Sequence, residues 1–236
     1  MSKERADVIK SLGATVVPVS KEEGGFVGSI ELTEKYASEN PNVFLPQQFA
    51  NDANVEAHAY STAPELLKQM SAYGSTMTAF VAGVGTGGTV MGVHRYLKEH
   101  APAVKVHPLE PFDSPTLTTG HKIGSHRIQG ISDEFIPEIV DLEVLDTIVS
   151  VHDGDAICMA QRLATEMGLP VGISSGANLL GALKLAYDSG EDCAVATVFA
   201  DCNKKYLSTD YVKEEAIKDD FLCQEIELHH FDVIKG

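Results

Sequence analysis

The sequence lacks any apolar run long enough to cross a lipid bilayer. A membrane-spanning helix needs roughly 18 or more consecutive apolar residues, and no stretch of the 236 residues approaches that length. The first residues, Met1-Ser2-Lys3-Glu4-Arg5, contain no apolar core of the kind found in secretory signals. Hydrophobic residues make up 44% of the chain, which is ordinary for a globular protein. We therefore expect a soluble, cytoplasmic protein.

Basic residues are scarce: 18 Lys and Arg stand against 34 Asp and Glu, for a formal charge of −16. Proteins that bind nucleic acid need a basic face to contact the phosphate backbone. The charge balance therefore argues against a nucleic-acid partner, and the acidic excess is explained by solubility.

Cysteine is also sparse, and the spacings typical of metal or nucleophile sites are missing. The four cysteines form no C-x-x-C pair, and no H-E-x-x-H or G-x-S-x-G sequence occurs. Cys158 and Cys193 lie in apolar contexts typical of inert core thiols. We expect no metal site, no serine nucleophile and a reducing compartment.

What is present is an alternation of helical and strand patterns. The predicted helices are Ser2–Leu12, Phe26–Ser38, 54–70, Val90–His100, Asp153–Met167 and Ala177–Tyr187. The predicted strands are Thr15–Val19, Val43–Leu45, Thr78–Val84, Val104–Leu109, Thr147–Val151, Pro170–Ile173 and Cys193–Phe199, and the tail Glu225–Ile234 reads as an edge strand or a docking arm. This order predicts an α/β fold of three layers, αβα, around a mostly parallel sheet. We place a small α/β domain at residues 1–50 and a large domain at 51–236.

A glycine-rich turn between a strand and a helix is the most informative stretch. Gly83-Val84-Gly85-Thr86-Gly87-Gly88-Thr89 follows an apolar run and precedes the helix that starts near Val90. Such a turn offers unpaired N–H groups and the positive end of a helix dipole to an anion. The hydroxyls of Thr86 and Thr89 add donors suited to a phosphate monoester. The turn therefore predicts a phosphate site.

Two other interpretations of the glycines stay open at this point. Gly83, Gly85 and Gly88 also satisfy the dinucleotide fingerprint, with Glu110 at the end of the next strand as the ribose-binding carboxylate. Alternatively, the glycines serve only tight strand–helix packing. A second strand-to-helix turn, Gly172-Ile173-Ser174-Ser175-Gly176, is either a serine helix cap or the far side of the same cleft.

These residues resemble the cysteine synthase (O-acetylserine sulfhydrylase) and cystathionine β-synthase family, which has the tryptophan-synthase-β-like fold. Gly85-Thr86-Gly87-Gly88-Thr89 is similar to the family's phosphate cradle, and Gly172–Ala177 to its pyridine-binding turn. Further matches are Gln48–His58 (Q-F-x-N-x-x-N-x-x-A-H), the rim Ile128-Gln129-Gly130-Ile131 and the closing motif Tyr206-Leu207-Ser208-Thr209.

The resemblance implies a pyridoxal phosphate (PLP) enzyme that carries out β-replacement or β-elimination on an O-activated serine. The implied phosphate ligands are Gly85, Thr86, Gly87, Gly88 and Thr89. Ser175 is the implied partner of the pyridine nitrogen, and Gln48 and Gly130 are the implied substrate-binding residues.

Some family features have no counterpart here. The lysine that forms the Schiff base and the asparagine loop that grips the substrate carboxylate belong to a segment ahead of the part that Met1–Leu12 resembles. We therefore expect no catalytic residue in this chain, no covalent cofactor attachment and no activity of the chain alone. A separate N-terminal fragment, a homodimer partner or serine acetyltransferase are the partners that the resemblance suggests. A non-catalytic, truncated paralogue that binds phosphate or PLP is the alternative.

Overall fold

A four-stranded parallel sheet forms the centre of the chain in the computed structural model, which describes residues 2–131, 134–190 and 193–234. Its strands are β1 (Ala79–Gly83), β2 (Lys105–Pro111), β3 (Val149–Val151) and β4 (Val195–Ala196), in the order β3-β2-β1-β4. Every pairing is parallel, with Ala79 opposite Lys105 and Leu109 opposite Val149. The predicted α/β class is confirmed.

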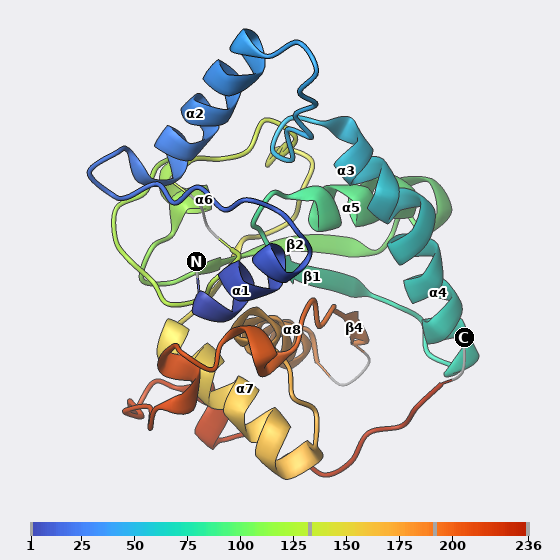
Figure 1. Cartoon of the computed structure of the whole chain (residues 1–236). Coiled ribbons are helices and arrows are strands. Elements are labelled where there is room, and N and C mark those ends of the chain that lie inside the picture. The colour runs from blue at the N-terminus through green and yellow to red at the C-terminus, as the bar shows by residue number, and fades with distance from the viewer. Residues whose placement is uncertain (1, 132–133, 191–192, 235–236) are drawn as a thin grey trace.

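Helices cover both faces of this sheet (Figure 1). α7 (Asp153–Met167) and α8 (Ile173–Ser189) lie on one side. The other side carries α3 (Asp52–Ala57), the π-helical turn η1 (His58–Thr62), α4 (Ala63–Ala72) and α5 (Gly88–His100). The remaining helices are α1 (Lys3–Ser11), α2 (Gly25–Glu39) and α6 (Thr116–Thr119), with short 3₁₀ turns at Asn203–Lys205, Asp210–Val212 and Leu222–Gln224.

The alternation of side chains along β1 separates the core into two clusters. Val81 packs with Leu109 and the inner faces of α7 and α8. Its neighbours Phe80 and Ala82 point the other way, and they pack with Val93 and Leu97 of α5. Because successive residues of a strand face opposite sides, one strand supplies both hydrophobic layers. This arrangement is the three-layer architecture that the sequence predicts.

Two predicted strands are absent, and those predictions are wrong. Residues 15–19 and 43–45 have the β-branched and aromatic content of strands, yet no regular structure is assigned to either. A strand requires a neighbour that pairs with its N–H and C=O groups. In the described part of the chain, β1 to β4 pair only with one another, so neither segment has such a neighbour.

Three other boundaries also differ from the sequence prediction. Only Val171 of the predicted strand 170–173 pairs, through an isolated bridge to Cys202, because α8 already begins at Ile173. The predicted strand 193–199 is reduced to Val195–Ala196. The tail 225–234 has no strand, and Ile226 and Leu228 pack against the core beside α7 and α8.

The N-terminal helices α1 and α2 contain no buried residue. Several of their apolar side chains face solvent, with Val8 of α1 58% and Tyr36 of α2 59% exposed, and the nearby Leu12, Val17 and Phe44 are 81%, 66% and 80% exposed. In the described residues, no helix is both long and apolar enough to span a membrane.

Close packing of α7 against α8 depends on a glycine at their contact. A Cβ on Gly176 would lie 2.2 Å from the carbonyl oxygen of Ala156 and 3.0 Å from the Cβ of Ala160. The two helices approach each other so closely only because this position lacks a side chain.

We therefore predict that Gly176→Ala lowers the free energy of unfolding by about 1–3 kcal/mol, the usual cost of overpacking a core. Urea denaturation provides the measurement. Ser189→Ala, at the exposed end of the same helix, is the control and should change stability by less than about 0.5 kcal/mol. Equal stability of the two variants would contradict the packing argument.

Candidate functional site

The glycine loop lies between the end of β1 and the start of α5. Gly87 is the N-cap residue of α5, in the left-handed conformation with φ +87°, and as a glycine it makes no side-chain cap hydrogen bond. The first N–H groups of an uncapped helix have no partner inside the helix and carry partial positive charge. The loop therefore directs several backbone donors to one place at the carboxyl edge of the sheet.

The rim predicted from Ile128–Ile131 lies directly against this loop. A Cβ on Gly85 would lie 2.3 Å from the carbonyl oxygen of Gly130, and one on Gly83 would lie 2.7 Å from Cγ2 of Ile131. No side chain fits at either position. The glycines are thus required by the approach of a second segment.

The two threonines of the loop have different partners. The Oγ1 of Thr86 lies 2.9 Å from Nδ2 of Asn54 and 3.3 Å from the backbone nitrogen of Gly88. The Oγ1 of Thr89 lies 3.3 Å from Nε2 of His58, in the π-helical turn. Burial lowers the pKa of His58, which favours the neutral imidazole. Asn54 and His58 belong to the Gln48–His58 motif, but sequence reasoning gave them no role.

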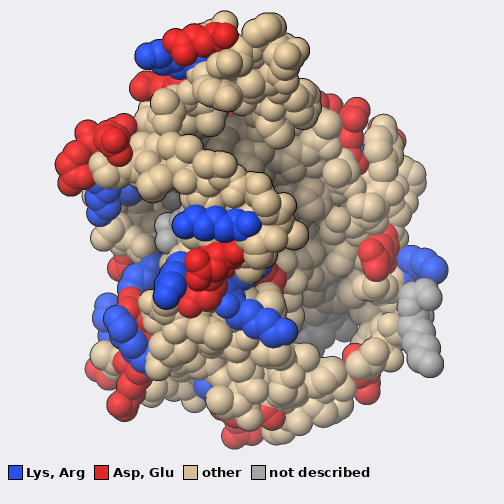
Figure 2. Space-filling model, viewed as in Figure 1, with Lys and Arg blue, Asp and Glu red and all other residues tan. Residues whose placement is uncertain are grey.

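Gln48 is linked to the loop through its backbone. Its carbonyl oxygen accepts a hydrogen bond from Nδ2 of Asn54 at 2.8 Å. Gln48 also lines a cavity of about 650 Å³, whose lining includes Phe26, Phe49 and Phe135. These rings meet edge to face or tilted, with centroids 5.3 to 6.3 Å apart. Figure 2 shows that this face of the molecule is hollowed, with a mostly uncharged visible wall.

The second predicted turn lies beside the first. The backbone nitrogen of Gly83 donates to Oδ1 of Asn178, in the first turns of α8, at 2.8 Å. Ser175 is fully buried in the same helix start, and its Oγ has no hydrogen-bond partner among the described residues. A buried hydroxyl without a partner is costly unless a bound group satisfies it. The Ser175 hydroxyl is therefore available to hydrogen-bond a bound group.

Glu110 does not serve the alternative role of a ribose-binding carboxylate. It is fully buried, and its carboxylate accepts hydrogen bonds from the backbone nitrogens of Leu117 and Thr118 and from Thr118 Oγ1. The carboxylate holds α6 against the sheet. The dinucleotide interpretation requires this carboxylate to bind a ribose, so that prediction is wrong.

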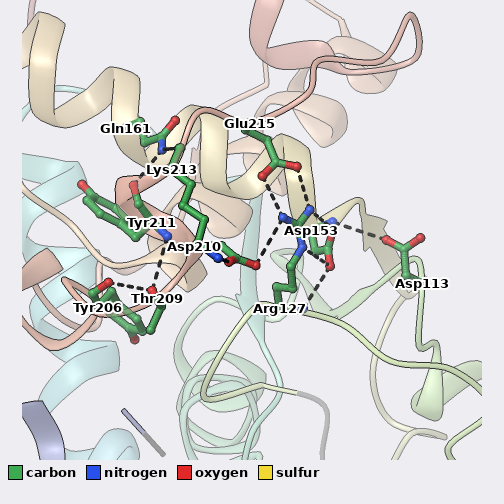
Figure 3. Close-up of polar contacts among 10 residues, drawn as sticks. All are labelled: Asp113, Arg127, Asp153, Gln161, Tyr206, Thr209, Asp210, Tyr211, Lys213 and Glu215. Atoms are coloured by element: carbon green, nitrogen blue, oxygen red, sulfur yellow. Dashed lines mark hydrogen bonds and ion pairs between the residues drawn. The ribbon is translucent and has the colours of Figure 1, made fainter. Parts of the chain in front are cut away.

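Arg127 anchors the rim to α7 and the C-terminal segment (Figure 3). Its guanidinium lies 2.9 Å from Oδ1 of Asp153, 2.7 Å from Oε1 of Glu215 and 3.5 Å from Oδ2 of Asp210. The hydrogen bonds to Glu215 and Asp153 raise the pKa of Arg127 above its usual range. Gln129 and Gly130 follow within three residues, so this ion cluster fixes where the rim begins.

Arg5 of α1 holds the other end of the rim. It donates to Oε1 of Gln129 at 2.5 Å and to the hydroxyl of Tyr206 at 2.8 Å. Its guanidinium also stacks 4.7 Å from the ring centre of Tyr206, the first residue of the closing motif. Burial, together with the hydrogen bond to Asp201, raises the pKa of Tyr206, so the phenol stays protonated.

No described lysine is positioned as a buried amine at this site. All of them are exposed except Lys184, whose Nζ donates to the carbonyl oxygen of Ser150 at 2.8 Å. Among the described residues there is also no group of three His, Cys, Asp or Glu side chains that could hold a metal.

Comparison with known proteins identifies the family. The pyridoxal-phosphate dependent enzyme family matches residues 1–201. The chain belongs to this family. It is 42% identical over 210 residues to the probable cysteine synthase of Bacillus subtilis, which covers 89% of this chain and 67% of the relative.

Solved structures agree with this assignment. A hydrogen sulfide-producing enzyme from Fusobacterium nucleatum superposes with a TM-score of 0.91 at 55% identity, over 95% of this chain and 67% of that one. A cysteine synthase from Entamoeba histolytica gives a TM-score of 0.83 at 35% identity, over 95% of this chain and 65% of that one. The chain spans about two thirds of the length of these relatives. The resemblance to cysteine synthases is confirmed.

The residues present fit the cofactor of this family. The uncapped helix start and the crowded glycines form a cradle that a side chain would fill. The unpartnered hydroxyl of Ser175 lies in the neighbouring helix start, so a phosphate-bearing ring can be held at two points. Ser132 and Asp133, directly after the rim, lie outside the described residues, and the next residue, Glu134, pairs with Lys122 at 3.2 Å.

We predict that Arg127→Met lowers the free energy of unfolding by about 1–3 kcal/mol at pH 7, because it strips charged hydrogen bonds from partly buried carboxylates. Burial alone would raise the pKa of Asp153, but the hydrogen bonds and charge of Arg127 outweigh it and lower that pKa. A lowered carboxylate pKa stabilises the fold above about pH 4, and the stabilisation is lost as the pH falls through the folded value.

The difference between wild type and Arg127→Met should therefore shrink when urea denaturation is repeated near pH 3. Arg95→Met is the matched control, since Arg95 forms an exposed pair with Asp52, worth about 0–1 kcal/mol. A loss in Arg127→Met no larger than in the control, or one that is the same at both pH values, would refute the role of the cluster.

Proposed function

We propose that this chain provides the phosphate- and ring-binding part of a PLP-dependent enzyme for β-replacement or β-elimination on a serine-derived amino acid. The observation that carries this proposal is the pairing of two helix starts: the glycine loop Gly85–Thr89, whose N-cap residue has no side chain, and the start of α8, with the unpartnered hydroxyl of Ser175. When bound, the cofactor would supply an electron sink for breaking bonds at the α and β carbons of the substrate.

The phosphate would be held in the loop of Gly85, Thr86, Gly87, Gly88 and Thr89, by the two threonine hydroxyls and by backbone nitrogens other than that of Gly88, which donates to Oγ1 of Thr86. Each donor contributes about 1–2 kcal/mol, and the end of the α5 dipole adds to their attraction. A helix N-terminus binds phosphate without needing a basic side chain. This arrangement suits a chain with a charge of −16.

Ser175 would hydrogen-bond the pyridine nitrogen. A serine hydroxyl is too weak an acid to protonate pyridine fully, so it orients the ring and leaves it a moderate electron acceptor. A moderate acceptor suffices for β-elimination, because the leaving group takes up the electron pair. Gln48 and Gly130, at the cavity and the rim, would contact the carboxylate of the substrate.

The identity of the leaving group has two candidates. The cysteine synthases among the relatives favour an O-activated serine. The hydrogen sulfide-producing relative from Fusobacterium nucleatum, at 55% identity, favours release of sulfide instead. The cavity lined by Phe26, Phe49 and Phe135 would accept the small, weakly polar group that either reaction needs beside the β carbon.

Catalysis would also require an amine and a carboxylate-binding loop from another segment. The described lysines are exposed, apart from Lys184, which is bonded to Ser150. We propose that the chain alone is inactive. We propose that a lysine-bearing segment would cover the exposed apolar residues of α1 and α2 and the unpaired segments 15–19 and 43–45. A homodimer partner and the tail of serine acetyltransferase are the other occupants suggested by the resemblance.

The first test is cofactor binding to the purified chain. We expect PLP to bind non-covalently with millimolar to micromolar affinity, roughly what these hydrogen bonds supply after association costs. Inorganic phosphate should compete. Borohydride reduction followed by peptide mapping should reveal no preferred lysine. A stoichiometric adduct at one lysine would contradict the proposed inactivity, and failure to bind PLP or phosphate would contradict the proposed site.

Ser175→Ala separates ring binding from phosphate binding. It should weaken PLP about threefold to tenfold, the value of one neutral hydrogen bond, while the affinity for inorganic phosphate stays unchanged. Ser174→Ala, next to it in the same helix start, is the matched control. Fluorescence titration measures PLP binding, and ³¹P NMR measures the binding of inorganic phosphate. If Ser175→Ala leaves the PLP affinity unchanged, Ser175 does not contact the ring.

The second test is complementation with the N-terminal third of the Bacillus subtilis relative, supplied as a separate polypeptide. Val17→Lys with Phe44→Lys should weaken its binding at least tenfold, because two charges would be buried on the apolar surface. Val233→Lys, in the tail, alters a side chain that is also 80% exposed and should have no effect. Calorimetry reports the binding, and equal affinities would exclude this surface.

A further inference from the structure

Asn54 has two hydrogen bonds from a single amide nitrogen. It lies in α3, and its Nδ2 donates to the carbonyl oxygen of Gln48 at 2.8 Å and to the Oγ1 of Thr86 at 2.9 Å. The side chain therefore joins the segment that carries the proposed substrate glutamine to the loop that would hold the phosphate.

The orientation of this amide is fixed by chemistry. A backbone carbonyl oxygen can only accept, so the group that faces Gln48 must be the nitrogen. The same nitrogen faces Thr86, so Thr86 receives an N–H and cannot donate in that direction. The amide oxygen of Asn54 lies on the other side, where a Cβ on Gly88 would come within 2.1 Å of it. The side chain of Asn54 therefore packs against Gly88 in the space that a Cβ would otherwise occupy.

Thr86 accepts a second hydrogen bond from the backbone nitrogen of Gly88 at 3.3 Å. A hydroxyl has one hydrogen and two acceptor lone pairs. With both lone pairs facing N–H groups, the remaining hydrogen has to point away from them. We propose that Asn54 is a positioning residue that commits the Thr86 hydroxyl to donate to a phosphate oxygen.

Thr89 differs in this respect. Its partner, Nε2 of His58, is a donor in one tautomer and an acceptor in the other. The Thr89 hydroxyl is therefore free to point either way, whereas that of Thr86 is not. Orienting a donor before the anion arrives removes the cost of turning it during binding. The inference rests on the proposed function, because it assumes that the loop binds phosphate.

The test uses the whole chain, with inorganic phosphate followed by ³¹P NMR and PLP followed by fluorescence. Asn54→Ala leaves the Thr86 hydroxyl free to rotate and should lower the affinity for both ligands about fivefold. Asn54→Asp is nearly isosteric, but its carboxylate draws the Thr86 hydrogen toward itself. It should weaken both ligands tenfold or more, as expected for a lost hydrogen bond to a charged group.

A double-mutant cycle separates positioning from general structural damage. If Asn54 acts through the Thr86 hydroxyl, Asn54→Ala should change the affinity less than twofold in a Thr86→Val background. Asn51→Ala is the matched control: Asn51 donates to Pro46 and caps the same helix at Ala53 but does not contact Thr86. It should lower stability and leave the affinity within about twofold of wild type.

The outcomes are distinct. Equal affinities of wild type and both Asn54 variants, or additive losses in the double mutant, would overturn the inference while the phosphate site itself stands. If wild type binds neither inorganic phosphate nor PLP, the proposed function fails first. Thermal unfolding shows whether each variant is folded, and only folded variants are used in the double-mutant cycle.

Discussion

The structure of the site depends on backbone approaching backbone where no side chain fits. Gly83 and Gly85 come against Ile131 and the carbonyl oxygen of Gly130, and Gly88 comes against the amide of Asn54. These contacts bring together the end of β1, the rim and the start of α3, which are far apart in sequence. A methyl group at any of the three glycines would push one of these segments away. The open N–H groups of α5 can converge only because this crowding holds the loop in one shape.

The sequence predicted a helix correctly where its hydrophobic periodicity agreed with the residues that signal the start and end of a helix. The helix over Asp153–Met167 was predicted with its observed bounds, because an acidic first turn precedes a regular apolar face and Gly168 ends it. The glycine turn and the parallel sheet followed from similarly local signals. Segments 15–19 and 43–45 failed because strand formation depends on a neighbour, and composition cannot say whether a neighbour exists. Within the site, glycines and hydroxyls were visible as a motif. The roles of Asn54, Arg5 and Arg127 depend on contacts with distant segments, and spacing alone does not reveal those.

Charge is used in two different ways in this protein. Arg127 forms ion pairs with Asp153, Asp210 and Glu215 and so holds the rim in place. In this cluster a basic side chain has a structural role among abundant carboxylates. The proposed anion site would rely instead on oriented amides and hydroxyls. Fixed dipoles have no mobile charge that the surrounding acidic residues could attract or neutralise. An acidic chain can therefore hold an anion without a basic pocket.

The link from Arg5 to Gln129 gives α1 a significance beyond its size. α1 buries no residue of its own and contacts the body of the protein through polar groups, including Ser2 with Lys205 and Glu4 with Ser208. Arg5 nevertheless bonds the rim that closes on the glycine loop. If the proposed anion site is correct, a partner that contacts the outer side of this helix would also stabilise the rim, and an anion bound in the loop would in turn favour the observed position of the helix. Binding of a partner at α1 and binding of an anion at the loop would then be coupled through Arg5 and Gln129.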